Sequence, residues 1–184
     1  MGVETVSQNI GRIINWRTPG INQWVVDGAQ FAGTVVTVGV GKDYADLLSA
    51  IDDTVGDTMF LVYPGTYDST PTNGTLGLDD DRTLYVKGMG GSYNDVVIKR
   101  FSIYNQSIFV EWCTVHYTGG TGWMGCIEPA DTSTGHSFIL NKCAIIADNG
   151  SHPVYCPSPT TVLPSLFKLS YCLVDEPSWD IYCQ

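Results

Sequence analysis

Three segments of the chain share one pattern. Ser107–His116 reads SIFVEWCTVH, Ser137–Ile146 reads SFILNKCAII and Leu166–Asp175 reads LFKLSYCLVD. Each segment has two apolar residues two positions apart, then two residues that we interpret as a bend, a cysteine, and another apolar residue two positions later. Because side chains alternate between the two faces of a strand, the apolar residues share one face. We therefore interpret each segment as two short strands that meet at a corner.

The cysteines repeat with nearly the same period. Cys113, Cys143 and Cys172 form one series, and a second series consists of the remaining three, Cys126, Cys156 and Cys183. A fixed period of about 29 residues is typical of a repeat architecture. Because one such unit cannot bury its own apolar face, neighbouring units must stack about 4.8 Å apart. The pattern predicts an all-β fold, a single-stranded parallel β-helix.

The same template continues upstream in weaker form. One inward position is expected to run along the axis as a column of apolar side chains. Its members are Phe60, Leu84, Ile108, Phe138 and Phe167. The segment 96–103 also fits the template, but it lies too close to the unit that begins at Ser107 to form a separate turn. We therefore interpret it as a third strand of the same turn. These units predict about five coils.

A short helix is expected to cap the N-terminal end of the stack. The segment 41–53 reads GKDYADLLSAIDD and has helical spacing. Its apolar stripe comprises Tyr44, Leu47, Leu48 and Ile51. Asp43 is the predicted N-cap residue. Such a helix hides the edge amides of the first turn.

The predicted domain organisation has two parts. Residues 35–184 form the parallel β-helix domain, and residues 1–34 form an N-terminal arm. The arm shows no repeat unit but carries Trp16, Trp24 and Phe31 among polar residues. Exposed aromatic surface of this kind is typical of a docking segment.

Charge and composition exclude several partners. The 184 residues carry a formal net charge of −10 and only nine lysines and arginines. A nucleic-acid binder needs a basic face, so we expect no nucleic-acid partner. An anionic membrane surface is excluded for the same reason, and no apolar run is long enough to span a bilayer. Residues 1–12 lack the pattern of a secretory signal.

Two segments carry a resemblance to a known family. KDYADLLSAIDD at 42–53 and GDTMFLVYPGTY at 56–67 resemble the first helix and first strand of right-handed parallel β-helix proteins of the pectin-lyase-like superfamily. The resemblance covers roughly residues 36–184. Asn141 stands where an asparagine ladder often occupies the corner in that family. The resemblance implies an architecture, whereas one fold hosts many functions.

Several side chains invite a catalytic interpretation, and each has a structural alternative. The cluster Asp79–Asp81 fits either a calcium or sugar site or a solvated turn. Glu111 beside His116 fits either an acid–base pair or an exposed corner with a surface histidine. Arg82 and Arg100 belong to no recognisable lyase motif.

Metal and redox sites have little support in the sequence. His136 and His152 lie in predicted loops near Cys156, but their spacing matches no metal-binding motif. Without a secretory signal, we expect the six cysteines to be reduced and buried rather than disulfide-bonded. We therefore assign no catalytic residue, no cofactor and no metal ligand.

The function expected from the sequence is structural. The chain resembles non-catalytic components of bacteriophage virions, such as a capsid decoration protein, a head fibre or a short tail spike. We expect a homotrimer that assembles in the host cytoplasm and attaches to a capsid or tail protein through residues 1–34. The alternative is a β-helix that binds a cell-surface glycan or degrades a polysaccharide, as a tail-spike depolymerase or lyase does. A third interpretation, a bacterial adhesin, requires an export route.

Overall fold

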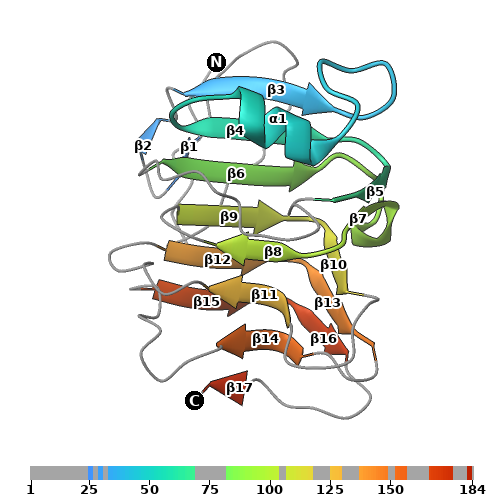
Figure 1. Ribbon diagram of the computed structural model, residues 1–184, viewed down its shortest axis with the longest axis vertical. Helices are drawn as coiled ribbons and strands as arrows, with labels where there is room; N and C mark the ends of the chain where they lie inside the picture. Colours follow the sequence, from blue (N-terminus) through green and yellow to red (C-terminus); the bar gives the residue numbers. More distant parts are fainter. Residues whose placement is uncertain are drawn as a thin grey trace, which may run out of the picture.

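The computed structural model describes residues 25–26, 29–30, 33–68, 82–103, 107–117, 125–129, 137–148, 152–156, 166–175 and 182–183. In this part of the chain, parallel strands stack into a β-solenoid with little helix (Figure 1). The expected all-β parallel β-helix is thus confirmed. The division into an arm at 1–34 and a β-helix at 35–184 stays a prediction, because residues 1–24 lie outside the described residues.

Three parallel sheets form the faces of the solenoid. The first sheet contains β3 (Thr34–Val38), β4 (Thr58–Val62), β6 (Thr83–Gly88), β9 (Ser107–Glu111), β12 (Ser137–Asn141) and β15 (Leu166–Ser170). The second contains β5 (Gly65–Tyr67), β7 (Val96–Ile98), β10 (Thr114–Tyr117), β13 (Ala144–Ala147) and β16 (Leu173–Asp175). The third contains β8 (Phe101–Ile103), β11 (Gly125–Pro129), β14 (His152–Cys156) and β17 (Tyr182–Cys183). Separately, β1 (Val25–Val26) and β2 (Ala29–Gln30) form an antiparallel pair.

The number of turns is smaller than the five coils expected. Three turns place a strand of three or more residues on every face: β6–β7–β8, β9–β10–β11 and β12–β13–β14. The turn β15–β16–β17 ends in a strand of only two residues. The turn that contains β4 and β5 has no described strand on the third face. The repeat pattern counted these partial turns as coils because it detects single strands rather than closed turns.

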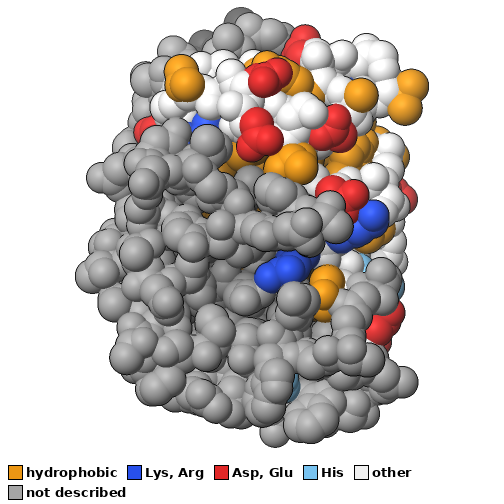
Figure 2. All heavy atoms as spheres, viewed as in Figure 1, with side chains coloured by type: hydrophobic (Ala, Val, Ile, Leu, Met, Phe, Trp, Pro, Cys, Tyr) orange, Lys and Arg blue, Asp and Glu red, His pale blue; other side chains and the backbone are white. Residues whose placement is uncertain are grey.

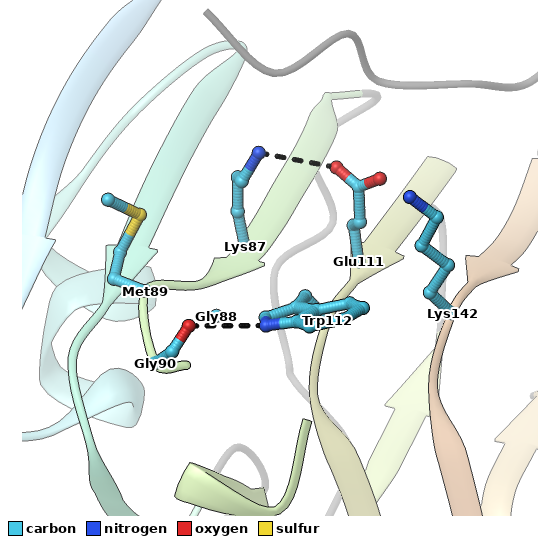
Figure 3. A pocket seen from close by; sticks show the side chains of 7 residues that line it. All are labelled: Lys87, Gly88, Met89, Gly90, Glu111, Trp112 and Lys142. Atoms are coloured by element: carbon cyan, nitrogen blue, oxygen red, sulfur yellow. Dashed lines mark hydrogen bonds and ion pairs between the residues drawn. The ribbon is translucent and has the colours of Figure 1, made fainter. Parts of the chain in front are cut away.

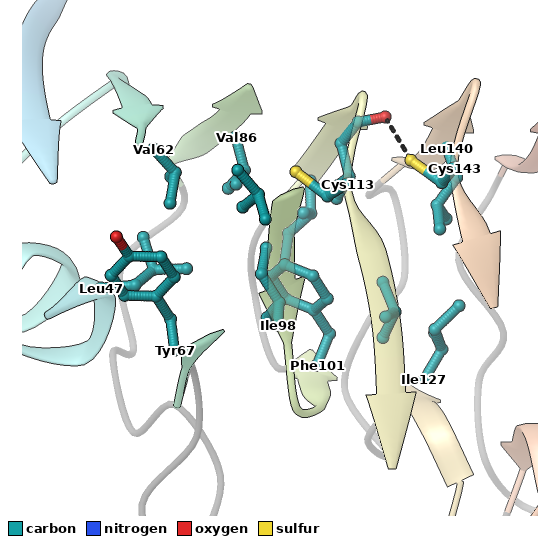
Figure 4. Packing of buried hydrophobic residues seen from close by; sticks show 14 of the residues in the cluster. Leu47, Val62, Tyr67, Val86, Ile98, Phe101, Cys113, Ile127, Leu140 and Cys143 are labelled. Atoms are coloured by element: carbon teal, nitrogen blue, oxygen red, sulfur yellow. Dashed lines mark hydrogen bonds between the residues drawn. The ribbon is translucent and has the colours of Figure 1, made fainter. Parts of the chain in front are cut away.

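One continuous apolar core fills the space between the sheets (Figure 4). Ile108 and Phe138 pair in register, and Val110 and Leu140 follow two positions later on the same face. All four side chains are at most 1% exposed. Burying a side chain of this size stabilises the fold by about 1.5–3 kcal/mol. The stacked column therefore accounts for much of the stability of the solenoid.

The register of the first turns differs from the prediction. Leu84 pairs with Thr58, and Phe60 pairs with Val86. Phe60 therefore lies two residues away from the column to which it was assigned, although it still points into the core. A shift of two residues keeps a side chain on the same face of a strand, so alternation alone could not distinguish the two registers.

The second cysteine series is also displaced. Gly125 pairs with His152 and Ile127 pairs with Val154, which places Cys126 between these pairs and not beside Cys156. Cys156 and Cys183 do pair in register. The regular spacing of this series was therefore misleading at its first step, because the loops between the strands differ in length.

The first cysteine series behaves as predicted. Cys113 and Cys143 are buried, and Cys172 is half-buried in the last turn. Strands on both sides of the three cysteines pair in register, so the thiols form one column at the corner between the first and second sheets. The burial of Cys113 and Cys143 agrees with the prediction, and the reduced state of the six cysteines stays a prediction.

The predicted capping helix exists but begins later than expected. Helix α1 spans Leu47–Asp53, and its N-cap is Asp46, whose carboxylate accepts a hydrogen bond of 2.8 Å from the Ser49 backbone. Asp43 instead accepts hydrogen bonds from the backbone and hydroxyl of Thr37, at 2.8 and 2.7 Å. This contact joins the loop before α1 to the strand β3, so helical spacing within the segment 41–53 could not predict it.

Arg82 connects α1 to the first sheet. Its guanidinium donates a hydrogen bond of 2.8 Å to the Ile51 carbonyl and a second one to the Thr54 carbonyl. These carbonyls lie at the C-terminal end of α1, where backbone acceptors lack helical partners. Arg82 is only 3% exposed, so its role in the described structure is to cap the helix.

The surface near α1 is acidic. Asp46, Asp52 and Asp53 are exposed at this helix, and Figure 2 shows acidic side chains at the same end of the molecule. Burial and the neighbouring Asp53 carboxylate raise the pKa of Asp52. Within the described residues, no helix has the length and apolar character needed to cross a membrane.

Candidate functional site

The corners between the first and second sheets share an unusual backbone conformation. Trp112, Lys142 and Tyr171 each have a positive φ, of 62°, 54° and 54°. A left-handed conformation costs roughly 1–2 kcal/mol for a residue with a Cβ. A backbone hydrogen bond at the corner offsets part of this cost, because the amide of Trp112 donates to the Asn141 carbonyl at 3.2 Å. The bend is therefore made by one left-handed residue, not by the two predicted bend residues.

Gly88 occupies the corresponding corner one turn earlier. A Cβ at this position would lie 1.9 Å from the Trp112 carbonyl oxygen. Only glycine lets the two turns approach so closely. Gly88 and Trp112 both line the pocket that forms the candidate site.

A row of buried polar side chains ends the strands of the first sheet. Lys87 pairs in register with Glu111, and Glu111 pairs with Asn141. These three residues are only 4–5% exposed. The Lys87 ammonium lies 3.4 Å from Glu111 Oε2, and Asn141 Nδ2 donates to Glu111 Oε1 at 2.9 Å. Both carboxylate oxygens of Glu111 therefore have a partner.

Burial and the neighbouring charge change the pKa of Lys87 in opposite directions. Desolvation lowers the pKa of the Lys87 ammonium, and the neighbouring Glu111 carboxylate partly offsets this effect. A buried charge is tolerated when it is paired and hydrogen-bonded. The pair fixes the end of β6 to the end of β9, one turn further along the axis.

A pocket of about 260 Å³ opens beside this row (Figure 3). Its lining consists of Lys87, Gly88, Met89, Gly90, Glu111, Trp112 and Lys142. Trp112 Nε1 donates to the Gly90 carbonyl at 3.2 Å, which fixes the orientation of the indole. Tyr93 packs edge-on against the same ring, with 6.4 Å between centroids. The pocket thus presents a rigid aromatic ring.

The pocket carries an excess of positive charge. The Lys142 ammonium lies 5.8 Å from the centre of the Trp112 ring, within the range of a cation–π interaction. Lys87 supplies a second ammonium and Glu111 the one carboxylate of the lining. Two of the nine basic residues of an acidic chain therefore meet at this site. The arrangement suits a ligand with an anionic group and a face that can stack on an aromatic ring.

The structure does not bring the predicted acid–base pair together. His116 Nε2 lies 3.0 Å from Asp148 Oδ1 at the surface of the second sheet. Glu111 is buried and bonds to Lys87 and Asn141 instead. Because each residue has a different partner, the interpretation of Glu111 and His116 as a catalytic pair has no geometric support.

The other predicted candidates are dispersed. Asp79–Asp81 and His136 lie outside the described residues, as does the side chain of Cys156. His152 is buried on β14. Arg100 lies 5.7 Å from the ring centre of Tyr117. Among the residues that the structure describes, no group of three or more histidine, cysteine or acidic side chains could hold a metal ion.

Sequence reasoning missed the pocket itself. It identified Glu111 as half of an acid–base pair or as an exposed corner. The repeat template also places Met89 at the inward position that Cys113 occupies one turn later. Met89 is 39% exposed and lines the pocket instead. The reason is the 3₁₀ helix η1 (Tyr93–Asp95), which precedes β7 and separates Met89 from the next strand. The glycine pair Gly90–Gly91 was the available signal that the chain departs from the template here.

No family model, curated protein or solved structure matches the chain. The fold and the geometry of the pocket are therefore the basis for a functional proposal.

Proposed function

We propose that the protein is a non-catalytic structural component of a bacteriophage particle, whose solenoid is displayed on the particle surface. In this proposal it is a homotrimer, and residues 1–34 attach it to a capsid or tail protein. Its finer affiliation, with the pectin-lyase-like superfamily and with decoration proteins, head fibres or spikes, belongs to the same proposal. Assembly takes place in the host cytoplasm.

One observation supports a non-catalytic role above the others. Hydrolysis of a glycosidic bond by the usual mechanism needs two carboxyl groups, one as acid and one as base or nucleophile. The pocket lining holds a single carboxylate, Glu111, and both of its oxygens bond to neighbouring side chains. Such a carboxylate stabilises the stack and is poorly placed to transfer a proton to a ligand.

The continuous core supports the display role. Parallel turns locked by one apolar column and by the row Lys87, Glu111 and Asn141 make a rigid rod. Each turn packs on its neighbours along the axis, so the spacing between turns is fixed. Rigid spacing is what a surface fibre or decoration protein requires.

The display proposal predicts labelling of intact particles. An antibody raised against residues 35–184 should bind particles purified from the source culture, in immunogold electron microscopy. A chain that lacks residues 1–34 should fold but should not be incorporated, because the attachment segment is gone. Unlabelled intact particles would contradict the display role, and retained incorporation of the shortened chain would contradict the anchor.

The pocket favours glycan binding as a second candidate function. Sugars stack their apolar faces on aromatic rings, and Trp112 offers such a ring beside the Lys142 ammonium. Binding of this kind is compatible with a displayed, non-catalytic solenoid, because a surface protein of a particle meets the glycans of the host cell.

The glycan candidate predicts a loss of binding in Trp112→Asn. Asparagine tolerates the left-handed backbone, so the variant removes the ring and keeps the corner. The matched control is Tyr171→Asn, which makes a similar change at an equivalent left-handed corner. Retention on immobilised acidic polysaccharides should fall in the first variant alone. Shortening of the polysaccharide that disappears in Glu111→Gln or Asp80→Asn would instead establish an enzyme.

A further inference from the structure

The column of thiols becomes accessible at its last member. Cys113 is 0% exposed and Cys143 is 2% exposed, whereas Cys172 is half-buried. The reason is position: Cys172 precedes β16, which is the terminal strand of the second sheet. A reagent in solution therefore reaches one thiol of the column much more readily than the two deeper ones.

Cys143 and Cys172 lie side by side on adjacent turns. The residues before them, Asn141 and Ser170, pair in register, and so do the residues after them, Ala144 and Leu173. The amide of Leu173 donates to the Cys143 carbonyl at 2.9 Å. Adjacent strands lie about 4.8 Å apart, which is within the Cα–Cα range of a disulfide.

The side chain of Cys172 points toward the turn that contains Cys143. Its Sγ lies 3.5 Å from the Leu140 carbonyl oxygen of that turn. The Sγ of Cys143 lies 3.6 Å from the Val110 carbonyl, one turn further back (Figure 4). Cys143 Sγ also lies 3.4 Å from the Asn141 carbonyl oxygen. Both contacts are long and have a weak sulfur donor, so a rotation of the Cys143 side chain toward Cys172 sacrifices only weak interactions.

We propose that Cys172 and Cys143 form a redox-active pair, in which Cys172 attacks a small-molecule disulfide of the glutathione class and Cys143 resolves the product. The final state is an intramolecular disulfide between the last two turns of the solenoid. This inference does not depend on the function proposed above.

The chemistry of the two thiols supports these roles. A hydrogen bond from Cys143 lowers the pKa of Cys172 to about 6, and neighbouring backbone groups act in the same direction. Burial raises the pKa of Cys143. Of the two thiols, Cys172 is therefore the one that ionises more readily, and the thiolate is the nucleophile in disulfide exchange.

The reaction balances in two steps. The Cys172 thiolate attacks one sulfur of oxidised glutathione, the S–S bond of glutathione breaks, and a glutathione thiolate leaves and takes up a proton from water. Cys143 then loses its proton to water and attacks Cys172 Sγ. The mixed disulfide breaks, and the second glutathione thiolate takes up a proton. Two protein thiols are oxidised, and one molecule of oxidised glutathione is reduced to two thiols.

The resulting bond would join β12–β13 to β15–β16. Among the described strands, β16 pairs with β13 alone, and its Leu173 and Val174 are 53% and 39% exposed. A covalent link closes the loop of chain between the two cysteines and restricts the unfolded state. The pair would thus stabilise this end of the described solenoid under oxidising conditions.

The experiment uses the full chain, first reduced and then incubated with oxidised glutathione at neutral pH. Peptide mapping by mass spectrometry should identify a Cys143–Cys172 disulfide and no lasting glutathione adduct. In Cys143→Ser, the glutathione adduct should instead accumulate on Cys172. The control Cys113→Ser changes a buried thiol of the same column and should leave the Cys143–Cys172 disulfide unchanged.

A second measurement tests the reactivity of Cys172 directly. In the folded, reduced protein, iodoacetamide should alkylate Cys172 faster than Cys113 by a factor of about ten or more, because only the former is an accessible thiolate. Equal rates would overturn the assignment of Cys172 as the nucleophile. A stable adduct on Cys172 of the unmodified chain, or loss of the disulfide in Cys113→Ser, would overturn the pairing with Cys143.

Discussion

Glu111→Ala is expected to lower the free energy of unfolding by about 3–5 kcal/mol, because it leaves a buried charge without its partner. Lys87 and Glu111 are each 5% exposed, and their charged groups lie 3.4 Å apart. The variant also removes the acceptor of the Asn141 side-chain hydrogen bond. Urea denaturation followed by circular dichroism measures the change.

The control for this prediction is Asp148→Ala. Asp148 lies 3.0 Å from His116, but the two side chains are 49% and 30% exposed. A surface pair of this kind contributes about 0–1 kcal/mol. If the two variants lose similar stability, the buried row is not what holds the corners of the first sheet together.

Phe138→Ala is expected to cost about 3–5 kcal/mol by leaving a cavity in the stacked column. Phe138 is fully buried, pairs with Ile108, and packs edge-on against Phe101 with 6.4 Å between ring centroids. Backbone hydrogen bonds between the strands hold the neighbouring turns in place, so these turns can relax only partly into the cavity. The midpoint and slope of the urea transition report this loss.

Val40→Ala is the matched control for the core variant. Val40 is 98% exposed, so its shortening should change the free energy of unfolding by no more than about 0.5 kcal/mol. A small effect of Phe138→Ala would show that the column tolerates cavities. The description of the solenoid as one tightly packed core would then be wrong.

The sequence pattern predicted the inward faces of the strands better than their outward faces. The alternation of Ile108 and Val110 and the column of Cys113, Cys143 and Cys172 were predicted correctly. On the outer face of the first sheet, Met59, Tyr85 and Phe109 form a second apolar cluster. Tyr85 and Phe109 stack with 5.0 Å between ring centroids. No prediction was made for the residues of that face, since the repeat was identified from the inward positions alone.

The candidate site could be predicted only in fragments. Glu111 was singled out, but its partners come from other turns. Lys87 is 24 residues from Glu111, and Asn141 is 30 residues away in the opposite direction. The repeat template aligned the three residues at one corner position, and their pairing in register confirms this alignment. That their side chains are buried and bonded to one another was not predicted. The same holds for the contact of Arg82 with the end of α1.

The sequence by itself determined the units of two strands that meet at a corner, the inward positions of Ile108, Val110, Phe138 and Leu140, and the stacking of three cysteines. These follow from alternation and from a nearly constant repeat. The tertiary structure decided the register of Phe60, the start of α1, the displaced Cys126, the buried pair of Lys87 and Glu111 and the pocket beside Trp112. Each of these depends on how far the chain travels between strands. Loop length and corner geometry set that distance, and side-chain periodicity carries no information about either.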